Sequence, residues 1–165
     1  MAAARRAKHK VVLGDVFKIN LSNGVGYFQC VYVGPDRKAH LDIMRALPGV
    51  YTGGESISRI IRKKELFFFQ HPTDYSVGKW VEYIGNYPVP FFSRTPQFMR
   101  SGERLADGTK YWWIVNLYTL HRKKVPILTS KEKKLSQYGS ISISDLVERI
   151  ETGWKPVNWD FAVAD

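Results

Sequence analysis

Residues 13–34 read LGDVFKINLSNGVGYFQCVYVG and predict a β-hairpin. Phe17 and Ile19 alternate with polar residues, which is the pattern of a strand with one buried face. The run Ser22-Asn23-Gly24 follows, and these residue types tolerate the positive φ that a tight turn requires. The return run, residues 27–33, is rich in aromatic and β-branched side chains. We expect this hairpin to begin a curled, mostly antiparallel sheet.

The composition predicts one folded domain. Among 165 residues, 44% are hydrophobic and 14% are aromatic, which is enough to build a core. Residues 1–10 place several cations among alanines, so we expect a flexible basic arm followed by a single domain over residues 11–165. No apolar run approaches the roughly 18 residues that span a bilayer, and a lone cysteine excludes an internal disulfide. These features favour a soluble, unexported protein in the cytoplasm, with no membrane partner.

A formal net charge of +10 is the strongest compositional signal. An excess of cations favours an acidic partner, either a protein surface, a nucleic acid or anionic lipid. The same charge also keeps a protein soluble without any partner. Charge alone therefore leaves these interpretations open.

Patterns after the hairpin predict short strands and one short helix. Residues 39–47 fit either a strand or a helix, and we favour a strand because it extends a meander. Isoleucines at helical spacing predict an amphipathic helix near residues 56–64. Residues 66–69 indicate a strand buried on both faces, and residues 78–85 a half-buried strand that includes Trp80.

Three further segments complete the middle of the chain. Two prolines predict an extended, irregular segment from residue 86 towards Gly102. Residues 110–118 are apolar on both faces, so we expect a strand that is central or covered by a helix. The cations of residues 122–124 and 131–134 flank a loop that we expect to be solvated.

The last element is a helix near residues 145–152. Asp145 is expected to cap it, with Glu148 reaching back in a capping box. Trp154 and Trp159 are expected to pack that helix against the sheet. The fold class is therefore α+β, mostly antiparallel β, arranged as a curled sheet or partly open barrel.

Residues that carry catalytic or metal chemistry are scattered. The four histidines share no ligand-like spacing with Cys30 or a carboxylate, and Cys30 sits among apolar neighbours as a small buried residue would. The glycines of Ser22–Gly26 lack the helix and lysine of a phosphate-binding loop. We therefore expect no metal, no cofactor and no enzymatic activity.

Arginines and aromatic residues interleave between residues 83 and 112. These residue types dominate many protein interfaces, and the same side chains stack on single-stranded nucleic acid. Each of them could instead belong to the core, Trp112 above all. The candidate partner-binding residues are Tyr83, Tyr87, Arg94, Arg100, Arg104 and Trp112.

Several of these stretches resemble the immunity protein 26 family. The likeness is carried by Gly14–Leu21, the return strand ending in Val31, Leu66–Phe68, Gly78–Gly85 with Pro88 and Pro90, and the closing residues Glu148–Ile150 with Gly153 and Trp154. The resemblance implies a mostly β protein, encoded beside a bacterial polymorphic toxin, that protects the cell by binding this toxin. The expected function is thus a non-catalytic immunity protein that covers a toxin's active site, and the basic charge leads us to expect an acidic surface on that toxin. The alternative function is a basic nucleic-acid-binding module.

Overall fold

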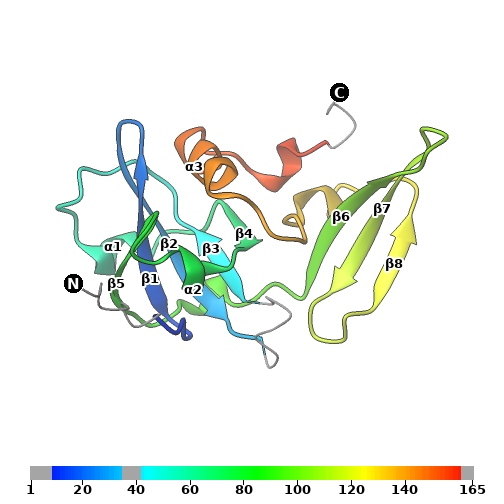
Figure 1. The fold of residues 1–165 in the computed structure, drawn as a ribbon. Helices are drawn as coiled ribbons and strands as arrows, with labels where there is room; N and C mark the ends of the chain where they lie inside the picture. Colours follow the sequence, from blue (N-terminus) through cyan, green and yellow to red (C-terminus); the bar gives the residue numbers. More distant parts are fainter. Residues whose placement is uncertain (1–8, 35–41, 161–165) are drawn as a thin grey trace, which may run out of the picture.

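The computed structural model describes residues 9–34 and 42–160, which form two antiparallel sheets (Figure 1). Five strands pair in the order β4-β3-β2-β1-β5, and three pair in the order β6-β7-β8. The strands are β1 (Asp15–Leu21), β2 (Gly24–Tyr32), β3 (Ile43–Ala46), β4 (Phe67–Gln70), β5 (Val81–Asn86), β6 (Phe98–Arg104), β7 (Lys110–Asn116) and β8 (Arg122–Val125). The helices are α1 (Ile57–Ile60), α2 (Thr73–Ser76) and α3 (Ile143–Glu151), and 3-10 turns occur at Phe91–Ser93 (η2), Glu132–Lys134 (η3) and Pro156–Asn158 (η4). The predicted α+β class with open, curled antiparallel sheets is confirmed.

The predicted hairpin is formed by β1 and β2. Leu21 pairs with Gly24, so Ser22 and Asn23 make a two-residue turn. Gly24 has φ of 146°, and a Cβ there would lie 2.3 Å from the carbonyl oxygen of Tyr51. The turn therefore requires glycine, both for its backbone angle and for this close approach.

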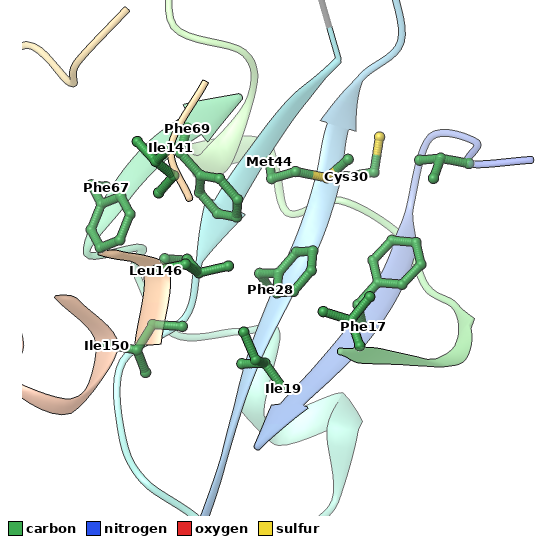
Figure 2. Close-up of a cluster of buried hydrophobic side chains, with 13 residues drawn as sticks. Phe17, Ile19, Phe28, Cys30, Met44, Phe67, Phe69, Ile141, Leu146 and Ile150 are labelled. Carbon is green, nitrogen blue, oxygen red and sulfur yellow. The ribbon is translucent and has the colours of Figure 1, made fainter. Parts of the chain in front are cut away.

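One face of the five-stranded sheet forms the main hydrophobic core with α3 (Figure 2). The ring of Phe28 lies 5.2 Å from that of Phe17 and 5.4 Å from that of Phe69, so the aromatic side chains of three strands form a continuous layer. Leu146 and Ile150 reach this layer from α3 and are buried. The alternation seen in the hairpin thus decides which side of the sheet the helix covers.

The other face of the same sheet is also covered. Val16, Tyr27 and Leu47 pack there against Ile60 and Ile61. Helix α1 supplies this cover, but its four residues are fewer than the helix expected over 56–64. A sheet covered on both sides explains why its strands carry few exposed positions.

An extended segment after η3 joins the two sheets. The amide of Arg100 in β6 donates to the carbonyl of Ser136 at 2.9 Å, and the amide of Tyr138 donates to the carbonyl of Arg100 at 2.7 Å. Further along, the amide of Ile141 donates to the carbonyl of Gln70 in β4 at 3.0 Å. Residues 136–141 therefore bind the edge strand of each sheet.

Two expectations for the middle of the chain are wrong. The irregular segment expected to reach Gly102 becomes β6 from Phe98, because β7 offers it a hydrogen-bonding partner. The first group of cations that flanks the expected loop lies in β8, which pairs with the other side of β7. Trp80 precedes β5 and is 57% exposed, so it contributes no half-buried strand position. The strand expected over residues 110–118, either central or covered by a helix, is β7, which lies between β6 and β8 and ends at Asn116.

The capping box of α3 lies one turn before the expected one. The hydroxyl of Ser142 accepts from the amide of Asp145 at 3.0 Å, and the Asp145 carboxylate accepts from the amide of Ser142 at 3.3 Å. Asp145 is thus the third residue of the helix rather than its cap. Trp154 packs edge-on against Phe67 as expected, whereas Trp159 packs against the three-stranded sheet.

Two other expectations concern the ends of the chain and the membrane. Residues 1–8 of the expected basic arm and residues 39–41 of the third predicted strand lie outside the described residues. In the described ranges, no helix combines the length and apolar character needed to cross a bilayer.

Candidate functional site

A groove of about 630 Å³ opens where the two sheets meet. We call it the inter-sheet groove. It is built from the end of β2, the segment after β5, the segment after η2 and the β7–β8 turn. Its lining residues are Leu13, Gly14, Val31, Tyr32, Asn86, Tyr87, Pro88, Val89, Arg94, Thr95 and Tyr118.

Short contacts fix the segments that line the groove. The hydroxyl of Thr95 donates to the carbonyl of Val31 at 3.0 Å, and the hydroxyl of Tyr118 donates to the carbonyl of Thr95 at 3.4 Å. The amide of Tyr87 donates to the carbonyl of Gly14 at 3.0 Å. A Cβ on Gly14 would lie 2.6 Å from the Tyr87 carbonyl oxygen, so only glycine permits this approach.

A buried polar network holds the groove wall from behind. Arg45 is fully buried, and its guanidinium donates to Oε1 of Gln29 and, at 2.8 Å, to the hydroxyl of Ser93. The Gln29 amide in turn donates to the carbonyl of Tyr87 at 2.8 Å. Both ends of the segment 87–93 are therefore tied to the interior of the five-stranded sheet.

Burial lowers the pKa of Arg45 to about 10, and the nearby Glu65 carboxylate opposes this shift. The guanidinium therefore stays charged at neutral pH. Ser93 donates its hydroxyl hydrogen bond to Glu65 while accepting one from Arg45. The network is thus a buried cation linked through a hydroxyl to a carboxylate, which is costly to break at any single member.

The rim of the groove combines a cation with exposed aromatic rings. The Arg94 guanidinium lies 4.3 Å from the ring centroid of Phe91, which is 78% exposed. Phe92 is also exposed, and Tyr118, which lines the groove, is 60% exposed. Within the described residues no carboxylate forms an ion pair with Arg94, so this charge is available to a partner.

The structure brings together two of the six predicted site residues, Tyr87 and Arg94, in the inter-sheet groove. Tyr83 is exposed on β5, where its ring lies 4.2 Å from that of His9; burial, together with Asp15, raises its pKa. Arg104 is exposed at the end of β6, and Trp112 is half-buried on β7. These three residues do not line the groove.

Arg100 is not part of any exposed surface, so its predicted role in binding a partner is wrong. It is 1% exposed, and its guanidinium donates to the carbonyls of Leu135, Pro156 and Trp159 at 3.1, 2.6 and 3.1 Å. The same group lies 4.6 Å from the ring centroid of Trp112 and 5.0 Å from that of Trp159. Burial lowers the pKa of Arg100 to about 10, which leaves it charged at neutral pH.

Sequence reasoning missed Tyr32, Tyr118, Phe91 and Phe92 as groove and rim residues. The aromatic and apolar pattern of residues 110–118 predicts that Tyr118 belongs to a strand, whereas β7 ends at Asn116. Two adjacent phenylalanines in a proline-rich, irregular segment were the signal available for the rim, because such a segment offers few strand positions that would bury both rings.

Other residues that carry chemistry have local structural roles. His71 is buried between the carbonyl of Ile141 at 3.0 Å and the hydroxyl of Ser76 at 2.5 Å, and burial lowers its pKa. The Lys124 ammonium lies 3.6 Å from the ring centroid of the buried Tyr111. Over residues 9–34 and 42–160, no three histidine, cysteine or acidic side chains gather as a metal ion would need.

Compared with known proteins, the chain matches no family model, no curated protein and no solved structure. The likeness to the immunity protein 26 family stays a prediction from the residues that carry it.

Proposed function

We propose that this protein is a non-catalytic immunity protein that neutralises a cognate bacterial toxin by covering the toxin's active site. The contact surface is the inter-sheet groove together with its rim, Phe91 and Phe92. The toxin presents an acidic, partly apolar surface to it. The proposal combines the resemblance of the sequence with the character of the groove.

The observation that carries the proposal is the grouping of Tyr32, Tyr87, Tyr118 and Arg94 in one groove of about 630 Å³. Tyrosine and arginine are the residues that most often supply binding energy in protein interfaces. The strongly exposed Phe91 beside Arg94 adds apolar area that a monomer gains nothing from exposing. The net charge of +10 would speed association with an acidic partner.

The alternative, a basic nucleic-acid-binding module, has less support from the aromatic residues of the three-stranded sheet. Binding of single strands uses open aromatic faces on which bases stack. On the three-stranded sheet, Lys124 lies over the buried ring of Tyr111, and the indole of Trp113 donates to Glu103 at 2.7 Å. The face of the Tyr111 ring and the N–H group of the Trp113 indole therefore already contact side chains of the protein itself.

The test is binding to the toxin encoded beside this gene, measured by calorimetry and by rescue of growth when both are expressed. Arg94→Ala combined with Tyr118→Ala should weaken binding by roughly 2 kcal/mol or more and abolish rescue, since both side chains line the groove and are of the types that most often supply binding energy. Arg62→Ala, which removes an exposed arginine outside the groove, should leave both readouts unchanged.

Two results would overturn the proposal. One is full rescue by the double variant at wild-type affinity. The other is a gene with no toxin neighbour whose product binds random DNA or RNA with a steep salt dependence, as a nucleic-acid-binding module would.

A further inference from the structure

A second groove lies on a different part of the surface and shares no lining residue with the inter-sheet groove. It has a volume of about 500 Å³. We call it the lysine groove and define it by Lys64, Lys134, Lys155, Leu66, Pro156 and Val157. An adjoining hollow of about 250 Å³ shares Lys64, Leu66, Lys134 and Pro156 with it and extends over Phe98.

The three lysines come from three separate segments of the chain. Lys64 precedes β4, Lys134 ends η3, and Lys155 precedes η4. All three are exposed, and none forms an ion pair with a carboxylate among the described residues. Three cations that line one groove and form no ion pair within the described part of the chain repel one another, and a bound anionic group would relieve this repulsion.

Among the described residues that line the groove, Glu65 carries the carboxylate, and this carboxylate forms a hydrogen bond inside the protein. Glu65 accepts the hydrogen bond of Ser93, a fully buried residue that belongs to the Arg45 network. Its negative charge is therefore directed towards the interior cation Arg45, which it stabilises. The lysine groove thus presents positive charge to a ligand.

Arg100 supports one wall of the lysine groove from the interior of the protein. Its guanidinium holds the carbonyl of Pro156 at 2.6 Å and that of Trp159 at 3.1 Å. These bonds fix η4, which supplies Pro156 and Val157 to the groove. Val157 is 52% exposed although it is apolar, so the wall offers hydrophobic surface to a ligand.

We propose that the lysine groove binds an acidic peptide segment that also carries aliphatic side chains. Carboxylates of the segment would pair with the three lysines, while its aliphatic groups would cover Leu66, Pro156 and Val157. A nucleic acid fits less well, because the apolar part of the described lining consists of proline and aliphatic side chains and includes no aromatic face on which a base could stack. The proposal does not depend on the identity of the toxin, since it concerns a separate surface.

The test is binding of a short labelled peptide that alternates glutamate with leucine, measured by fluorescence anisotropy on the full-length protein. Replacing Lys64, Lys134 and Lys155 together by glutamine should weaken binding about tenfold, since three exposed ion pairs, each weak by itself, are lost together. A matched variant replaces Lys10, Lys79 and Lys123 by glutamine. It removes the same charge from exposed positions outside the groove and should change affinity less than about twofold.

Two further measurements test whether the carboxylates of the peptide bind beside the three lysines. Val157→Glu places a carboxylate on the exposed wall and should weaken peptide binding about as much as the triple lysine variant, while unfolding at the wild-type temperature. A peptide with glutamine in place of glutamate should not bind measurably. Both effects follow only if the ligand's carboxylates lie beside these lysines.

The proposal is overturned if the two lysine variants lose affinity equally, because binding would then depend on net charge alone. It is also overturned if a labelled oligothymidylate binds more tightly than the peptide and loses affinity only in the Lys64, Lys134 and Lys155 variant. That outcome would assign the lysine groove to nucleic acid.

Discussion

Arg45 and Gln29 face each other across β3 and β2, and Nε and one terminal nitrogen of the Arg45 guanidinium donate to the same Gln29 oxygen at 2.9 and 2.7 Å. This pair lies on the face of the sheet that supports the inter-sheet groove. Gln29 donates a hydrogen bond to the carbonyl of Tyr87, and Arg45 donates one to the hydroxyl of Ser93. Ser93 immediately precedes Arg94, so these bonds hold both ends of the segment in place. A buried cation therefore positions the segment that we propose to bind the toxin.

Arg45→Met should lower the free energy of unfolding by about 3 kcal/mol, because it leaves Gln29, Ser93 and the carbonyl of Ile61 without their donor. Urea unfolding at constant m value measures this loss. Arg62→Met at an exposed position serves as the control and should stay within about 0.5 kcal/mol of wild type. Equal stability of the two variants would contradict a structural role for the Arg45 network.

Arg100→Ala should destabilise the protein by roughly 2 kcal/mol or more, because three carbonyls lose a charged donor and two indole rings lose a stacked cation. Tryptophan fluorescence should shift as Trp112 and Trp159 become more accessible. Arg104→Ala, at an exposed position, should leave the thermal midpoint nearly unchanged. A wild-type midpoint for Arg100→Ala would contradict a structural role for this guanidinium.

Ser142→Ala should cost about 1 kcal/mol, since the Ser142 hydroxyl caps the amide of Asp145 at the start of α3. Glu148→Ala should cost clearly less, because the structure places Glu148 beyond the capping box. Thermal unfolding of both variants decides between the two positions of the box. A larger loss for Glu148→Ala would favour the box expected from the sequence.

The stability of the protein should fall as the pH drops below about 6.5, the ordinary pKa of histidine. Burial lowers the pKa of His71 in the folded state, so the unfolded chain binds the proton first and acid favours unfolding; above that pH the contribution is fully present. His71→Gln should flatten this part of the profile, measured by urea unfolding at a series of pH values. If both proteins lose stability in parallel, another group is responsible.

The sequence by itself determined the elements whose signals are local. The β1–β2 hairpin follows from alternating Phe17 and Ile19 and from a turn that needs glycine at position 24. The central place of β7 follows from its two apolar faces. In each case the pattern within a few residues predicts which side chains are buried in the folded protein.

The tertiary structure alone decided which cations are buried and which segments meet. Arg94 and Arg100 look alike in the sequence, yet one faces the inter-sheet groove and the other is enclosed by Trp112 and Trp159. Strands β6 and β8 form because β7 supplies their hydrogen-bonding partners, and each groove gathers residues from segments far apart in the chain. Burial of a charge depends on donors and acceptors brought by distant segments, and no local pattern records them.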